Sequence, residues 1–193
     1  MELKRIIRSK MLDDRRIKEA ESNVKQYLRD GLLKKQTNET AKAMYLENTD
    51  LSLQTAQKLL SLESKDYHPY LWVIVTSYYS MYYIANAVLL NFGYKVGNKV
   101  SHKVTADALI VFVRNKLEKQ FLEEYENLKE DALELMSQKA DALLKNLDYE
   151  REKRSKFQYQ MDEKAKREKA LTSLERGKDF VFEMKKLLNI KKF

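Results

Sequence analysis

Residues 69–92 read PYLWVIVTSYYSMYYIANAVLLNF, and the rest of the fold is best understood from this segment. It contains no charged residue, and Pro69 suits the first position of a helix because its missing N–H would have no partner there. We predict a helix to about Phe92, with Gly93 as its C-cap. By length the helix could cross a bilayer, but its serines, asparagines and tyrosines make a poor lipid-facing surface. We therefore interpret it as a helix that protein buries on most sides, with Trp72 in the core.

Amphipathic helices flank this segment on both sides. Helical spacing of apolar residues predicts one helix that ends near Leu62 and another that starts at Ser101 as N-cap and continues past a break near Lys129. Residues 34–39, which precede the first of these helices, are expected to be a polar connection, and residues 94–100, which precede the second, are expected to be a loop. The last helix has an apolar seam at steps of four and three, typical of a core-facing or coiled-coil-like helix. The seam consists of Ala170, Leu174, Gly177, Val181, Met184 and Leu188.

The sequence as a whole indicates an all-α protein. Only 4 glycines and 1 proline occur in 193 residues, so the residues that hairpins and tight turns need are scarce. The length suits one hydrophobic core. We predict an N-terminal helical extension over residues 1–38 and an up-and-down bundle of four or five helices over residues 39–193.

The composition excludes several kinds of chemistry. Without cysteine the chain has no disulfide, thiol nucleophile or thiolate metal site, which suits a reducing compartment. The basic first ten residues precede no apolar run, so we expect no signal peptide and a cytoplasmic protein that does not bind membranes. No Gly-rich phosphate loop, HExxH or Ser elbow occurs, and neither histidine follows a Glu by three positions, as a helical carboxylate metal site would require. We expect no cofactor and no metal.

Charge is segregated along a chain whose net charge is +8. Residues 118–150 hold ten carboxylates against four lysines, whereas residues 151–178 hold ten basic side chains against five acidic ones. One interpretation is two helix faces that pair within the bundle or across a dimer. The other is a basic groove that binds RNA or polyphosphate weakly and with marked salt dependence. The basic residues expected to make such contacts are Arg151, Lys153, Arg154, Lys156 and Lys103.

The central block resembles the HEPN family, the higher eukaryote and prokaryote nucleotide-binding domain. Residues 77–90, SYYSMYYIANAVLL, are followed by Gly93-Tyr94 and then by Ser101-His102, as in the small prokaryotic branch. An Arg and a Tyr follow later, at Arg154 and Tyr159. The resemblance covers roughly residues 43–188. It implies a helical bundle, often a homodimer, with a minimal nucleotidyltransferase as a frequent partner and a possible role in a toxin–antitoxin or stress-response system.

The sequence departs from the ribonucleases that the HEPN family includes. Their active sites carry an R-x(4-6)-H motif, and neither His68 nor His102 has the required Arg. Tyr159 best matches the position of the catalytic histidine, and a phenol with a pKa of about 10 is a poor general base at neutral pH. We therefore expect a non-catalytic or weakly active module that binds nucleotide, RNA or a nucleotidyltransferase. The alternatives are a divergent metal-independent ribonuclease toxin and a purely structural dimerisation bundle.

The expected site lies where the tyrosines of residues 77–90 meet the start of the last helix. Arg154 would bind a phosphate there and the tyrosines would stack on bases, whereas the structural alternative has Arg154 and Tyr159 tying two helices together. For His102 we favour hydrogen bonding at a helix start over catalysis. A homodimer is expected from the apolar seam of the last helix. The candidate nucleotide or RNA contacts are Tyr79, Tyr83, His102, Lys103, Arg151, Lys153, Arg154, Lys156 and Tyr159, and any catalytic role would fall to Arg154 and Tyr159.

Overall fold

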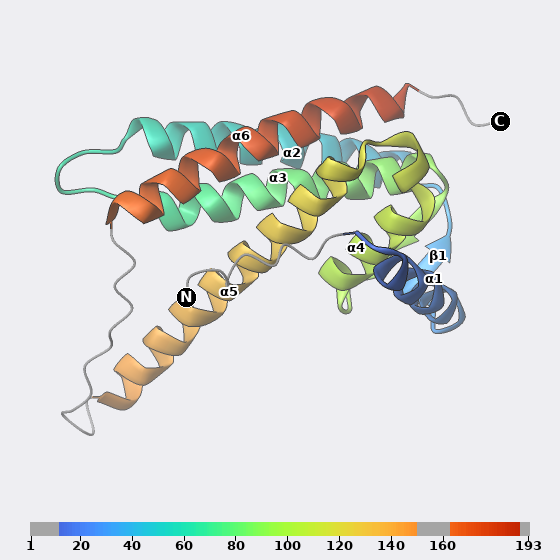
Figure 1. Ribbon diagram of the computed structural model, residues 1–193, viewed down its shortest axis with the longest axis horizontal. Helices are drawn as coiled ribbons and strands as arrows, with labels where there is room; N and C mark the ends of the chain where they lie inside the picture. Colours follow the sequence, from blue (N-terminus) through green and yellow to red (C-terminus); the bar gives the residue numbers. More distant parts are fainter. Residues whose placement is uncertain (1–11, 150–162, 190–193) are drawn as a thin grey trace.

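The computed structural model describes residues 12–149 and 163–189 (Figure 1). Helices dominate this part of the chain, which confirms the all-α prediction, and strands occur in it only as one short ribbon. The elements in chain order are α1 (Asp14–Arg29), β1 (Leu33–Lys35), α2 (Glu39–Ser61), α3 (Tyr70–Asn91), β2 (Tyr94–Val96), α4 (Ser101–Phe112), the 3-10 turn η2 (Arg114–Lys116), α5 (Lys119–Tyr149) and α6 (Glu163–Leu188).

Helix α3 is the central element of the fold and contacts α2, α4, α5 and α6. Most of its residues are buried, as predicted for residues 69–92. By length and composition alone it is the one helix among the described residues that could cross a membrane, and 78% of its most apolar window is buried by the other helices. The assignment of Trp72 to the core is wrong, since its side chain is 52% exposed. Trp72 lies in the first turn of α3, where the neighbouring residues Tyr70 and Val73 take the buried side.

Helix α6 runs parallel to α3 and packs its apolar seam against it (Figure 1). At one end Arg167 Nε donates to Glu63 Oε1 over 2.7 Å, and at the other Asn91 Nδ2 lies 3.4 Å from the Leu188 carbonyl oxygen. Between them the helices approach closely, because a Cβ on Gly177 would lie only 3.4 Å from the Ser77 carbonyl oxygen. The seam is therefore core-facing, one of its two predicted roles.

Helix α5 completes the bundle and runs antiparallel to α6. Tyr125 stacks on Phe180, with ring centroids 5.4 Å apart, and one turn and a half later Asp131 pairs with Lys169. Successive long helices α2, α3, α5 and α6 thus alternate in direction, as the up-and-down prediction requires. The expected break near Lys129 is wrong, since α5 is continuous there.

The break in this region instead separates α4 from α5 at residues 113–118. Val113 and Leu117 both reach the core, and η2 reorients the chain between them. Further along, Leu128 and Ala132 continue the buried face of α5, so nothing interrupts the helix at Lys129. Burial on both sides of the turn decides where the helices divide, and no Gly or Pro marks the place in the sequence.

The N-terminal part joins the bundle through α1 and a two-stranded ribbon. The Asp13 carboxylate caps α1 by accepting a hydrogen bond from Arg16 N over 2.7 Å, and Gly31 takes a left-handed conformation with φ 70° after the helix. The next residues form β1, which pairs antiparallel with β2. The two segments expected to be irregular therefore both contain strands. Ala20, Val24 and Leu33 belong to the same core cluster as α3, while the division of the chain at residue 38 stays a prediction.

The start of α4 also differs from the prediction. Ser101 is the first residue of the helix, and the N-cap position falls to Val100, which has a left-handed φ of 45° and no capping side chain. Such a conformation is uncommon for a β-branched residue. It lets the chain leave the ribbon and enter α4 directly, which carries His102 toward α3.

Candidate functional site

A cluster of aromatic rings lies where α3, α4 and α5 meet. We call it the tyrosine–histidine cluster: Tyr78, Tyr79, Tyr82, Tyr83, His102 and Tyr125. The four tyrosines of α3 stand at spacings of one, three and four residues, which places them on one side of the helix. Tyr45 of α2 extends the row by stacking on Tyr83, with ring centroids 6.2 Å apart.

His102 is the centre of this cluster. Its ring centroid lies 4.5 Å from that of Tyr82 and 5.9 Å from that of Tyr79. Its Nδ1 lies 2.6 Å from the hydroxyl oxygen of Tyr78, so the expected helix-start hydrogen bond gives way to a bond between helices. Tyr78 is fully buried, and a buried hydroxyl needs a hydrogen-bond partner.

The protonation of this pair follows from burial. Burial raises the pKa of Tyr78, so its phenol stays protonated at neutral pH. Burial and the nearby charge of Lys129 lower the pKa of His102, so its imidazole is neutral there. We assign the Tyr78 hydroxyl as donor to Nδ1, which leaves the imidazole hydrogen on Nε2. The pair is thus a neutral hydrogen-bonded couple rather than a cation.

The cluster has a buried layer and a half-exposed layer. Tyr78 and Tyr125 are buried, and the Tyr125 hydroxyl lacks a well-formed hydrogen bond within the described residues. Tyr79, Tyr82 and Tyr83 are half-buried, as is His102. The inner rings fill the core, and the outer rings keep part of their surface open to solvent.

A buried charge network lies beside this cluster and ties α1 to α4 and α5. We call it the Arg16 network. The Asp107 carboxylate is fully buried and accepts hydrogen bonds from Arg16 Nη2 at 2.6 Å, Asn23 Nδ2 at 3.0 Å and the Tyr27 hydroxyl at 2.9 Å. Arg16 also donates from Nε and Nη2 to Glu126, at 3.2 and 2.7 Å. Two carboxylates thus share one guanidinium.

The Arg16 network is electrostatically strong. Burial opposes the charge of Arg16, but hydrogen bonds and charges from Glu126 and Asp107 outweigh it and raise the pKa of the guanidinium. Burial and the hydrogen bond to Asp107 raise the pKa of Tyr27. Lys129 Nζ, 4.0 Å from Glu126, links this network to His102. These side chains hold in place the helices that carry the tyrosine–histidine cluster.

The Arg16 network contains none of the residues that were predicted for the site. A signal for it was present, because Asp107 is the one charged residue in residues 104–112, a mostly apolar part of α4. A lone carboxylate in a buried helix face requires a buried donor. The identity of that donor was not readable, since Arg16 lies 91 residues away in the chain.

The structure brings together only some of the predicted site residues. Tyr79, Tyr83 and His102 lie in one cluster, and Lys103 is exposed on α4 next to His102. The meeting of Tyr79 and Tyr83 with Arg154 stays a prediction. The remaining predicted residues lie outside the described part of the chain: Arg151, Lys153, Arg154, Lys156 and Tyr159.

Two further expectations concern ion pairs and metal ions. The acidic and basic halves of the sequence do meet within the bundle, where Lys169 Nζ lies 2.7 Å from Asp131 Oδ1. Among the described residues, no group of three or more His, Asp or Glu side chains is arranged to hold a metal ion.

No family model, no curated protein and no solved structure matches the chain. The function is therefore inferred from the chemistry of these side chains.

Proposed function

We propose that this chain is a HEPN-like module that binds nucleotide or RNA at the tyrosine–histidine cluster without cleaving it efficiently. The observation that carries the proposal is the grouping of four half-buried rings, Tyr79, Tyr82, Tyr83 and His102, on adjoining helices. Nucleobases stack on such rings, at about 1–3 kcal/mol per base.

The surroundings of the rings favour a phosphate-bearing ligand. Lys103 is exposed one residue after His102, and the charge of Lys129 acts on the same imidazole. Ammonium groups beside stacking rings form the usual combination for single-stranded nucleic acid. His102 itself is neutral and so contributes hydrogen bonding and stacking rather than charge.

The neutral state of His102 also favours a second candidate, a divergent ribonuclease. A general base works best when it is unprotonated at the working pH, and the lowered pKa of His102 meets that condition. Its Nδ1 accepts from Tyr78 and its Nε2 carries the hydrogen, so Nε2 could take a proton from a 2′-hydroxyl only in the other tautomer, in which Nδ1–H donates to the Tyr78 oxygen. We rank this second because the Tyr82 ring lies only 4.5 Å from the imidazole, centroid to centroid, and a partner cation for the transition state is supplied only by lysines such as Lys103.

The resemblance to the HEPN family adds proposals on partners and setting. These are a homodimer, a minimal nucleotidyltransferase partner, a role in a toxin–antitoxin or stress-response system, and a cytoplasmic location. A dimer would need a surface other than the α6 seam, since α3 covers that seam within the chain. The purely structural dimerisation bundle therefore loses the observation that suggested it.

Titration with nucleoside triphosphates and a short single-stranded RNA tests the proposal. Tyr82→Leu should weaken binding by about 1–3 kcal/mol, which is roughly 5- to 150-fold in the dissociation constant, because one stacking ring is lost. Tyr67→Leu is the matched control, since Tyr67 is exposed in the α2–α3 turn and outside the cluster.

Equal affinities of the two variants and the wild type would contradict the proposal. Efficient RNA cleavage by the wild type, lost in His102→Gln, would establish the ribonuclease instead.

A further inference from the structure

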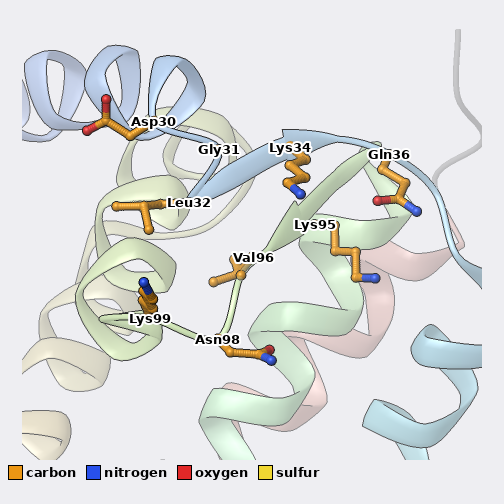
Figure 2. A pocket seen from close by; sticks show the side chains of 10 residues that line it. Asp30, Gly31, Leu32, Lys34, Gln36, Lys95, Val96, Asn98 and Lys99 are labelled. Atoms are coloured by element: carbon orange, nitrogen blue, oxygen red, sulfur yellow. The ribbon is translucent and has the colours of Figure 1, made fainter.

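A hollow of about 470 Å³ lies beside the β1–β2 ribbon (Figure 2). Its volume falls in the range of small-ligand sites. The residues of the ribbon and of the loop that follows β2 form most of its wall. The polar side chains lining it are Asp30, Lys34, Gln36, Lys95, Asn98 and Lys99.

Two of these lysines are held opposite each other by the ribbon. Lys34 and Lys95 are direct partners in the antiparallel register, so their side chains leave the same face of the ribbon. Like charges directly opposed in this way destabilise a pair of strands. The register therefore places two lysines side by side on one face of the ribbon, and Lys99 lines the same hollow.

No carboxylate neutralises this charge within the described residues. Lys34, Lys95 and Lys99 make no ion pair there, and the side-chain amides of Gln36 and Asn98 make no hydrogen bond. The one acidic residue of the wall is Asp30, whose carboxylate Figure 2 shows on the α1 side, apart from Lys34 and Lys95. The hollow thus carries unpaired donors and net positive charge.

The frame around these donors is fixed by the backbone. Gly97 N donates to the Leu32 carbonyl oxygen over 2.8 Å, and Gln36 N donates to the Gly93 carbonyl oxygen over 2.9 Å, at the two ends of the ribbon. A Cβ on Gly97 would lie 3.2 Å from the Leu32 oxygen, so the close approach suits glycine. The backbone positions of Lys34 and Lys95 are therefore held by a ladder of hydrogen bonds that extends beyond the three paired residues.

We propose that this hollow binds the phosphate groups of a compact oligophosphate, of the di- or triphosphate class. Phosphate oxygens would accept charge-assisted hydrogen bonds from Lys34, Lys95 and Lys99, with the amides of Gln36 and Asn98 as further donors. A bound polyanion would also relieve the repulsion between the paired lysines. The same phosphate chemistry could come from an RNA backbone, but the limited volume of the hollow favours a compact ligand. The site does not depend on the tyrosine–histidine cluster.

Calorimetric titration with tripolyphosphate at fixed ionic strength tests the proposal. The informative variant is the double substitution Lys34→Gln and Lys95→Gln, which we expect to weaken binding at least about tenfold through the loss of two charge-assisted contacts. The control is Lys18→Gln with Lys58→Gln, which removes the same charge at two exposed helix positions. We expect the control to stay within about twofold of wild type, since general electrostatic attraction is weak and screened.

A melting experiment on the same variants separates binding from folding. Because the ribbon variant removes a repulsive pair, it should melt no lower than wild type. A ribbon variant that melts well below the control would show that the lysines serve the fold, and would overturn the proposal. So would the absence of saturable tripolyphosphate binding by wild type, or equal losses in both double variants. A 5′-hydroxyl RNA that competes more strongly than tripolyphosphate would overturn the assignment to a compact ligand.

Discussion

At the residue scale, single side chains carry charges and hydroxyls into places that are otherwise apolar. Asp107 is fully buried and satisfied by three donors from α1, and the Tyr78 hydroxyl is satisfied by His102. Burying a polar group costs free energy unless a partner is present. Each of these groups is therefore stable only as a member of a pair or network. Removing one member leaves the others buried without a partner, which lowers the stability of the fold.

Asp107→Ala should lower the free energy of unfolding by about 3–5 kcal/mol, because it leaves the buried Arg16 guanidinium with one carboxylate fewer and strands the Tyr27 hydroxyl. Asp50→Ala provides the comparison, since Asp50 is half-exposed in its ion pair with Lys185 and such pairs contribute about 0–1 kcal/mol. Urea unfolding measures both. Similar losses in the two variants would mean that the Arg16 network does not hold α1 to the bundle.

The His102 imidazole should make stability depend on pH. Burial, with the charge of Lys129, lowers its pKa in the folded state below the unfolded value of about 6.5. The folded state then binds fewer protons, so this contribution is fully present above about pH 6.5 and is lost as pH falls through the folded pKa. The difference in unfolding free energy between wild type and His102→Gln should shrink as pH falls from 7 to 5. If the difference in unfolding free energy instead grew as pH fell from 7 to 5, the pKa of His102 would be raised by folding rather than lowered.

At the scale of elements, the contact between α3 and α6 rests on small residues. Gly177 faces Ser77 and Ser80, and a Cβ added there would meet their atoms at 3.4 and 3.5 Å, which is ordinary van der Waals contact. Small side chains let two helix backbones approach, and the larger residues of the seam then pack on either side. Gly177, Ser77 and Ser80 therefore mark a close approach of α3 and α6.

Two substitutions at Gly177 should act in opposite directions. Gly177→Ala should raise the free energy of unfolding by up to about 1 kcal/mol, since the methyl group fits and alanine is the better helix former. Gly177→Leu should lower it by about 1–3 kcal/mol, because the longer side chain overfills the contact with Ser77. Denaturant unfolding of both variants provides the measurement. A large decrease in the free energy of unfolding of Gly177→Ala would mean that α3 and α6 lie too close together at Gly177 to accommodate a methyl group.

At the scale of the whole molecule, the other helices surround α3, and the apolar seam of α6 packs against it within the same chain. Leu174 and most of the α6 seam are buried within one chain, whereas Phe182, on the other face of α6, is 63% exposed. The acidic face of α5 and the basic residues of α6 also meet inside the molecule, at Asp131 and Lys169. Association between copies therefore has to involve surfaces other than this seam.

Leu174→Ala should lower the free energy of unfolding by about 2–5 kcal/mol without changing the mass in solution, because the leucine fills the core of its own chain. Phe182→Ala should leave stability within about 1 kcal/mol of wild type, since that ring is mostly exposed. Light scattering and thermal melting together measure both effects. A dimeric wild type that Leu174→Ala converts to a monomer would place the seam between chains instead.

Sequence alone was enough to predict the helical class, the central buried helix, the end of α2 and the apolar seam of α6, whereas its core-facing role required the packing of α6 on α3. These follow from local periodicity, because a helix that buries one face must repeat apolar residues at helical spacing. Tertiary structure alone decided the pairing of Asp107 with Arg16, the bond between Tyr78 and His102, the β1–β2 ribbon, the turn at residues 113–118 and the exposure of Trp72. Each of these depends on which distant segments meet, and three-residue strands or single buried charges leave no periodic trace in the sequence.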